Sequence, residues 1–345
     1  MTQALYSKYI IDGVPKELTP AEILSQVMEK APEPAPVAGT IVDETFDPAP
    51  RPITLDPSRL GEYLQIVMAQ GRHTPVPFAS QCARSRIATA LIDTVWRSGN
   101  FHLDDLPLTA KWSFNPDWVG DMAAFYASVE AVADYIDPLH IAIRRIVCER
   151  GQFDVRFSTP FSGAPLLVDD QFHPDPQSWI AYVPFDTSDY RLGGSQLACG
   201  MGIGGGVCPQ VDDPDYLMDC FEVVRELAED GVLISAGTVS SGGIMATLER
   251  MRSEGAGCRA DISGIMSARS EADAVRILFS EVPGAIIQIR DSDFDYVDAE
   301  FLLQDVAWFP LGHPSADGLL HIDSSAKSGI QTILESLMQN AEGED

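Results

Sequence analysis

A cluster of hydroxyl and glycine residues is the part of this sequence best suited to bind a ligand. It lies between a short apolar run at residues 232–237 and a helix-like stretch at 244–249, and it contains Thr238, Ser240, Ser241, Gly242 and Gly243. Hydroxyls at a helix start can cap free backbone N–H groups, and glycines let a ligand or a neighbouring backbone approach closely. The sequence therefore predicts a strand, a small-residue turn and a helix.

Two further segments are predicted to surround this turn. Residues 255–261 are rich in small side chains and are expected to close the helix. Residues 274–290 are expected to form a helix end, a turn and a buried strand. A βα unit followed by a second strand is a plausible ligand platform, so the chemistry of this protein is expected to lie here.

Four motifs follow one another along the second half of the chain. They are Leu-Gly-Gly-Ser-Gln-Leu-Ala at 192–198, Ser-Ala-Gly-Thr-Val-Ser-Ser-Gly-Gly-Ile at 235–244, Gly-Ala-Gly-Cys at 255–258 and Leu-Phe-Ser-Glu-Val-Pro-Gly at 278–284. In this order and spacing they resemble the aminoimidazole ribonucleotide synthetase-like superfamily. Within it they resemble the phosphoribosylformylglycinamidine synthases, and most of all the second synthetase-like half of those enzymes. The resemblance spans about residues 83–325.

The chain departs from this family at positions that carry chemistry. The family's second motif has a His and two Asp, and the corresponding residues here are Gly237, Thr238 and Ser241. A Gly-Lys-Asp-Ser-Met loop of the catalytic members has no counterpart at residues 143–151. The family's reaction is an ATP-dependent conversion of an amide to an amidine, which needs Mg²⁺ held by carboxylates and a positioned base. The replacements therefore predict a depleted active site.

The resemblance implies binding residues but identifies no catalytic residue. The implied cofactor is ATP or ADP with Mg²⁺, and the implied substrate is small and phosphorylated. Glu281 is the retained acid of the last motif, but one carboxylate makes a weak metal site. The implied nucleotide- and substrate-binding residues are Gly193, Gly194, Ser195, Thr238, Ser240, Ser241, Gly242, Gly243 and Glu281.

The resemblance also implies an α+β fold with two synthetase-like domains. Residues 57–172 are expected to form an N-terminal sheet domain that pairs into a barrel on dimerisation, and residues 173–325 a C-terminal α/β sandwich. Residues 1–56 are predicted to be an appendage with a Pro-rich linker, in which Thr19 and Glu22 have the spacing of a helix start. Residues 326–345 are predicted to form a C-terminal helix and an acidic tail.

Composition limits the classes of partner. The net charge of −28 opposes binding to a nucleic-acid backbone, and no basic patch offsets it. The sequence has no run of about 18 apolar residues and no secretory signal pattern at its start, so a cytoplasmic protein that does not span a membrane is expected. The six cysteines contain no Cys-x-x-Cys pair, which favours reduced thiols over a zinc site or a disulfide framework.

Two other segments have alternative interpretations. Asp212, Asp213 and Asp215 could attract Mg²⁺, but acids beside a Pro at a helix start are more often caps. Residues 200–206, Gly-Met-Gly-Ile-Gly-Gly-Gly, could cradle a phosphate with backbone N–H groups, but no Gly-Lys-Ser/Thr follows them. In register with the family they fall on a helix end and a loop.

Three functions are consistent with these observations. The first is a half-length, active-site-depleted subunit related to phosphoribosylformylglycinamidine synthase in purine biosynthesis, paired with itself or with a catalytic synthase half. The second is an active ATP-dependent amidine-forming ligase with a rearranged site and without a glutaminase domain. The third is a scaffold or small-molecule binder outside purine synthesis, because a fold does not determine a function.

Overall fold

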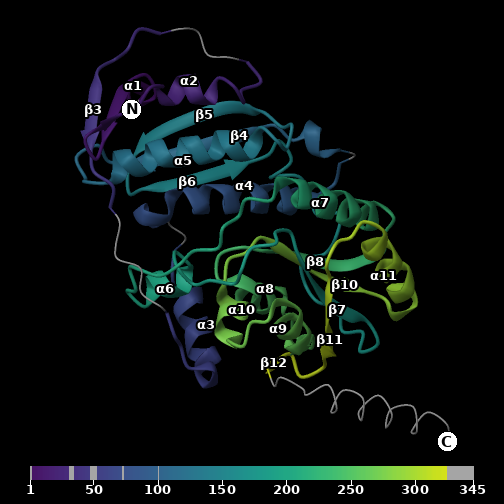
Figure 1. The fold of residues 1–345 in the computed structure, drawn as a ribbon. Helices are drawn as coiled ribbons and strands as arrows, with labels where there is room; N and C mark the ends of the chain where they lie inside the picture. Colours follow the sequence, from purple (N-terminus) through teal and green to yellow (C-terminus); the bar gives the residue numbers. More distant parts are fainter. Residues whose placement is uncertain (1, 31–34, 47–52, 72–73, 100, 325–345) are drawn as a thin grey trace, which may run out of the picture.

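The computed structural model describes residues 2–30, 35–46, 53–71, 74–99 and 101–324. These residues form three sheets, with strand orders β2-β1-β3, β5-β4-β6 and β12-β9-β11-β7-β10-β8. Figure 1 shows the second sheet in the upper half of the molecule and the third in the lower half, with α4 (Ala79–Val95) between them. The expected mixed fold of helices and sheets is therefore confirmed. The predicted helix in residues 326–345 lies outside the described residues.

The upper sheet is built on β4 (Leu108–Phe114), whose side chains alternate between buried and half-buried. β5 (Ile143–Arg150) is parallel to it and β6 (Asp154–Ser158) antiparallel. The Nε1 of Trp112 in β4 donates a 2.9 Å hydrogen bond to Ser128 Oγ on α5 (Asp121–Ile136). This alternation is what a sheet with one covered face requires, and α4 and α5 supply the cover.

The N-terminal segment packs onto α5. It contains α1 (Thr2–Leu5), β1 (Lys8–Ile11), β2 (Val14–Pro15), α2 (Pro20–Leu24) and β3 (Thr40–Asp43). The predicted helix start is confirmed, because Thr19 and Glu22 form a reciprocal capping box. The carboxylate of Asp43 accepts hydrogen bonds from three backbone N–H groups at the start of α5. Residues 2–46 of the predicted appendage, where described, are thus tied to the upper layer, whereas Ile53 packs into the core of the lower half.

The lower sheet has helices on both faces (Figure 1). Its strands are β7 (Trp179–Pro184), β8 (Leu233–Val239), β9 (Gly257–Asp261), β10 (Gly284–Ile289), β11 (Phe309–Ser315) and β12 (Leu320–Asp323). Alternate residues of β10 enter two cores. Ala285 and Ile287 share one core with α4 and the upper sheet, whereas Ile286 enters the other. The sheet is therefore the central layer of the lower half.

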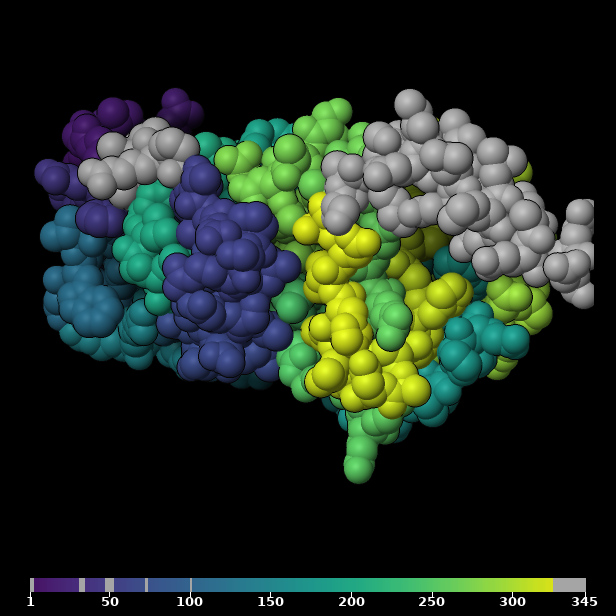
Figure 2. All heavy atoms as spheres, turned by 90° about the horizontal axis from the view of Figure 1, so that it is seen from below, coloured from purple at the N-terminus to yellow at the C-terminus, as the bar shows by residue number. Residues whose placement is uncertain are grey.

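Besides α4, seven helices pack around this sheet in the described part of the chain. On the side of the first core are α7 (Pro214–Glu229) and α11 (Phe294–Leu303). On the other are α3 (Leu60–Met68), α6 (Gln196–Gly200), α8 (Gly243–Met251), α9 (Ser263–Arg269) and α10 (Ala274–Phe279). Figure 2 shows α3, in indigo, at the surface between teal residues near 200 and green residues after 240. Short 3₁₀ helices span Pro57–Arg59, Val76–Phe78, Leu103–Asp105 and Asp291–Asp293.

One detail differs from the predictions. Residues 257–261 form strand β9 rather than a turn that closes α8, because they pair with β11 and β12. The strand after the βα unit, β10, pairs with β8 in antiparallel orientation. No described helix is long and apolar enough to cross a membrane.

Candidate functional site

A cavity lies where α4 meets two turns of the lower half. It is lined by α4 residues, by the turn before α6, by the turn before α8 and by Glu281. Of the nine predicted binding residues, Gly193, Gly194, Ser195, Ser240, Ser241 and Glu281 line it. Thr238 lines an adjoining cavity, and Gly242 and Gly243 form the start of α8 behind the wall. The structure thus brings these residues together from three separate segments.

Glycine conformation and side-chain contacts fix the turn before α8. Gly243 has a φ of +67°, and a Cβ there would lie 2.6 Å from the carbonyl oxygen of Leu278. A larger residue is therefore excluded by both backbone conformation and space. Thr238, four residues before Gly242, accepts a 2.9 Å hydrogen bond at Oγ1 from Nε1 of Trp96 at the end of α4. That hydroxyl therefore joins the lower sheet to the upper half.

Local hydrogen bonds also fix the conformation of the turn before α6. Ser195 caps the helix, since its Oγ accepts a 3.2 Å hydrogen bond from Ala198 N and donates one to Leu192 O. The backbone N–H of Gly193 bonds to Val207 O, and a Cβ at Gly193 would lie 2.5 Å from that oxygen. Ser195 is 2% exposed. Its hydroxyl therefore serves the local backbone, and the glycine is needed for close backbone approach.

Glu281 connects the two turns. Its Oε1 accepts a 2.8 Å hydrogen bond from Gln196 N and another of 2.8 Å from Gly242 N. Each of these N–H groups belongs to the start of a helix, where free donors favour a negative partner. The carboxylate therefore fixes the relative position of α6 and α8. The prediction that it binds a metal stays a prediction, and no group of three or more His, Cys, Asp or Glu in the described residues could hold a metal ion.

The fourth wall, from α4, was not identified from the sequence. It contributes Arg86, which is 7% exposed and lines both the cavity and the adjoining one. Nη1 of Arg86 donates to Asp154, Thr74 and Val155 O. The other α4 residues at the cavity are Gln81, Cys82, Ser85 and Thr89. No local sequence pattern identifies these residues as part of a site, because Arg86 and its partner Asp154 are 68 positions apart.

The buried pair of Arg86 and Asp154 sets the charge of this wall. Burial acts to raise the pKa of Asp154, but the Arg86 charge and the hydrogen bonds from Arg86, Thr74 and Arg156 outweigh it, so its pKa is lowered. Asp154 is therefore an anion at neutral pH, and its single charge is shared by Arg86 and Arg156. It also accepts a 2.6 Å hydrogen bond from Arg156 Nε.

Three thiols line the cavity, and those of Cys199 and Cys208 are poor nucleophiles. Burial, aided by the negative charge of Glu281, raises the pKa of Cys199 to about 11. Burial also raises the pKa of Cys208, with contributions from Cys82 and Glu281. Because the thiolate is the reactive form, both groups are unreactive at neutral pH. The expectation of free cysteines is confirmed, since none of the six forms a disulfide.

The two cavities differ in size and in the chemistry of their walls. The inner one, beside Glu281, has a volume of about 30 Å³, which is room for water but not for a larger ligand. The outer one, beside Thr238, has a volume of about 360 Å³. Arg86, Thr89 and Ser240 line both, so the cavities adjoin across these residues. Space for a small molecule therefore lies in the outer cavity.

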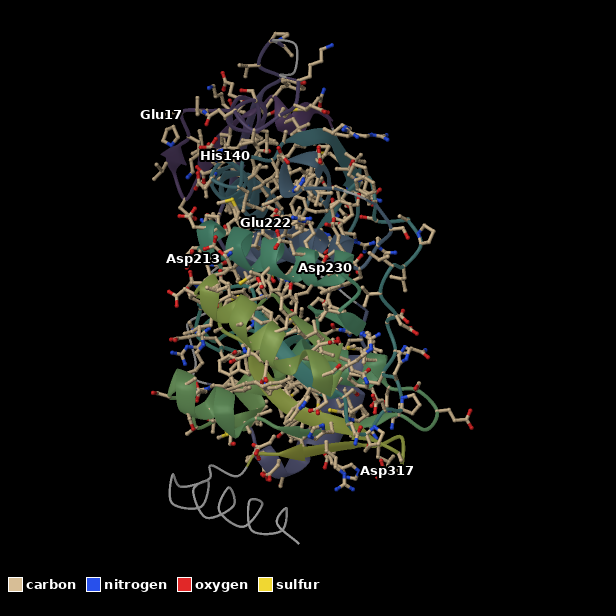
Figure 3. The ribbon with its side chains drawn as sticks, turned by 90° about the vertical axis from the view of Figure 1, so that its right-hand side faces the viewer. Glu17, His140, Asp213, Glu222, Asp230 and Asp317 are labelled. Atoms are coloured by element: carbon tan, nitrogen blue, oxygen red, sulfur yellow. The ribbon has the colours of Figure 1, made fainter. Side chains whose placement is uncertain are left out.

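The two alternative sites belong to helix ends. Asp213 is the N-cap of α7, and its Oδ1 accepts a 3.1 Å hydrogen bond from Tyr216 N, which confirms the capping interpretation. Residues 200–206 contain the end of α6 and a following loop, as the family register predicted. Figure 3 shows the labelled acids Glu17, Asp213, Glu222, Asp230 and Asp317 spread from one end of the molecule to the other. The negative charge is thus not gathered at one site.

Comparison with known proteins supports the family resemblance. Human phosphoribosylformylglycinamidine synthase is 25% identical over 252 residues, which cover 68% of this chain and 18% of the human protein. The PurLQS structure from Thermotoga maritima has a TM-score of 0.51 at 12% identity and covers 76% of this chain and 46% of that one. The chain resembles the aminoimidazole ribonucleotide synthetase-like superfamily in both sequence and fold.

The same comparisons define how far this likeness extends. The chain spans about a fifth of the human relative's length and under half of the PurLQS chain. A T. maritima PurL complexed with ATP, at 10% identity, covers 71% of this chain and 39% of that one with a TM-score of 0.44, which adds nothing to the fold assignment. No protein-family model matches the chain. The superfamily's mixed fold is thus present in a chain that corresponds to part of these relatives.

Proposed function

We propose that this protein is a phosphoribosylformylglycinamidine synthase-related subunit of purine biosynthesis whose synthetase-like site is depleted of catalytic groups. The observation that carries the proposal is the turn before α8. Thr238 and Ser241 occupy the positions where the family resemblance places carboxylates, and Thr238 is hydrogen-bonded to Trp96. Hydroxyls cannot replace two anions as ligands of Mg²⁺ beside a triphosphate.

The side chains around this turn also indicate how a nucleotide cofactor would be held. The retained acid, Glu281, accepts two helix N–H groups at Oε1, and the described residues contain no group of three metal-binding side chains. These residues do not fit a Mg²⁺ ion held by carboxylates. ATP or ADP, if bound, is therefore a structural ligand held by backbone N–H groups and hydroxyls without Mg²⁺.

The partner is a second copy of this chain or a catalytic synthase half in the cytoplasm. The β5-β4-β6 sheet has α4 and α5 on one face, and Thr109, Lys111 and Ser113 of β4 are half-buried on the other. Pairing of two such sheets into a barrel would cover this second face, and two-fold association is the commonest oligomeric symmetry. The two-domain division at residues 57–172 and 173–325 belongs to this proposal, and α3 of the first range packs against α6 and α8 of the second.

Calorimetry with ATP tests the proposal. ATP is titrated into the full chain once with Mg²⁺ and once with a chelator. We expect no binding or equal binding in the two titrations, because the site has too few carboxylates to hold the metal. Binding that requires Mg²⁺ would favour the second candidate, an active ATP-dependent ligase, and would contradict the depleted site. Sedimentation of the same sample tests whether the chain forms a dimer by itself.

A further inference from the structure

Two further cavities, away from the candidate site, lie end to end along α5. The first has a volume of about 360 Å³ and lies between α5, the start of α4 and the N-terminal segment. The second has a volume of about 700 Å³ and continues toward the C-terminal end of α5. Both are lined by Lys16, Tyr126 and Glu130, so they adjoin there and together form the α5 groove. Between Ala123 and Asp137 the groove follows a helical rise of about 21 Å.

The end of the groove near the start of α5 is apolar. Val14 and Phe46 line it, and these side chains are 60% and 56% exposed. The small side chain of Ala123 lies on the α5 wall, so the helix leaves space between the larger groups. Val119, the neighbour of the groove residue Gly120, is 74% exposed. Large apolar side chains exposed around a hollow are typical of a surface that binds a partner.

Acidic side chains outnumber basic ones along the groove. Among the described residues, Lys16 is the one basic residue that lines it. Its Nζ lies 3.7 Å from Glu130 Oε2 and 5.1 Å from the ring centre of Tyr126, so this charge is already paired. The acids that line the groove are Asp12, Glu17, Glu130, Asp134 and Asp137. The groove therefore carries negative charge that its own lysine does not balance.

The surroundings of Glu130 show the same imbalance. Burial raises the pKa of Glu130, and the charge of Asp134 adds to this rise against the opposing effect of Lys16. Lys8 does not line the groove, and it forms an ion pair with Glu22 instead. A further cation would stabilise the charged form of Glu130. Nucleic acids, anionic membranes and a second copy of this chain, whose net charge is −28, would be repelled.

We propose that the α5 groove binds an extended basic segment of a partner protein. Apolar side chains of the segment lie between Val14 and Phe46, and its Lys or Arg side chains lie beside Asp134 and Asp137. About six extended residues span the length of the groove. Helix α5 covers one face of the β5-β4-β6 sheet, so the groove leaves the opposite face free for the pairing proposed above. This inference goes beyond the proposed function, because it involves neither a nucleotide nor the synthetase-like site.

Titration with two matched peptides tests the inference. Each peptide has about eight residues, blocked ends and two leucines at one end, and the other end carries either three arginines or three glutamates. The full chain is titrated into each labelled peptide, and binding is followed by fluorescence anisotropy at low salt and in about 0.5 M salt. We expect the arginine peptide to bind at least about tenfold more tightly at low salt and to lose most of this preference at high salt. Equal affinities at low salt, or no binding of the arginine peptide, would overturn the proposal.

Variants at the two ends of the groove locate the binding. Val14→Ser and Asp134→Lys should each weaken binding of the arginine peptide about three- to tenfold, because they remove an apolar contact and an attractive charge. The matched controls are Leu303→Ser, at an exposed leucine of α11, and Glu254→Lys, at an exposed acid between α8 and β9, and both should bind as the parent does.

The controls separate the groove from the charge of the whole chain. Equal losses in the groove variants and the controls would show that the peptide responds to net charge alone, and this would contradict the assignment. Sedimentation of Val14→Ser tests the other occupant, because a changed oligomeric state would make the groove an interface between copies and the proposal wrong. Thermal unfolding of each variant shows that a change in affinity is not a loss of fold.

Discussion

The role of Glu281 as a clamp between two helix starts leads to a quantitative prediction. Glu281→Ala removes the acceptor of Gln196 N and Gly242 N, whose hydrogen bonds to Oε1 are both 2.8 Å long. A fully buried N–H left without a partner costs about 1–3 kcal/mol, so these two part-buried groups together predict a loss of up to about 6 kcal/mol in the free energy of unfolding. Glu281→Gln keeps an acceptor oxygen but loses the charge, and should cost about 2 kcal/mol, since charged hydrogen bonds exceed neutral ones by roughly 1 kcal/mol each.

Urea unfolding and amide hydrogen exchange measure this prediction directly. In Glu281→Ala the amides of Gln196 and Gly242 should exchange faster, and in Glu281→Gln most of their protection should return. Glu17→Ala, at an exposed glutamate, is the control and should leave stability and exchange unchanged. If Glu281→Ala is as stable as the parent within about 0.5 kcal/mol and both amides stay protected, the clamp is not supported.

Three further predictions concern the frame of the site. Gly243→Ala should lower the free energy of unfolding by more than about 1 kcal/mol, because φ is +67° and the new Cβ would lie 2.6 Å from Leu278 O; urea unfolding measures it. Asp43→Ala should lower the free energy of unfolding by about 0.5–2 kcal/mol, because it removes the cap of α5. Faster amide hydrogen exchange at the start of α5 would show that the loss occurs there. Asp154→Asn should lower the free energy of unfolding, measured in urea, by about 3–5 kcal/mol, because Arg86 would be buried without an anionic partner. Because the pKa of Asp154 is lowered in the folded state, its charge stabilises the parent above about pH 4, and this contribution is lost as the pH decreases below that value. The free energy of unfolding should therefore depend less on pH in the acid range for Asp154→Asn than for the parent.

Local signals in the sequence predicted the elements that form the site. β8, the following turn and α8 were correctly predicted from the apolar run, the hydroxyls and the paired glycines. The spacing of Thr19 and Glu22 gave a capping box, and the acid before Pro214 gave the cap of α7. Each of these features involves residues within a few positions of each other. Helix caps and turn glycines are therefore readable without tertiary information.

Contacts between distant segments could not be predicted in this way. The partners of Glu281 lie 85 and 39 positions away, and Asp154 lies 68 positions from Arg86. Residues 257–261 were predicted to close a helix, but pairing with β11 and β12 made them a strand. In each case the deciding partner is distant in the sequence. Arg86 in particular carries no motif, and its importance appears only when α4 is placed against β6.

Phosphate release tests the central claim, a depleted synthetase-like site, most directly. The full chain is incubated with MgATP, formylglycinamide ribonucleotide and ammonia, and inorganic phosphate is followed over time beside a sample without protein. The account predicts the same slow release in both samples, because Thr238 and Ser241 supply no anions to hold the metal. Release that depends on the protein, the ribonucleotide and ammonia together would contradict it and show that other groups perform the reaction.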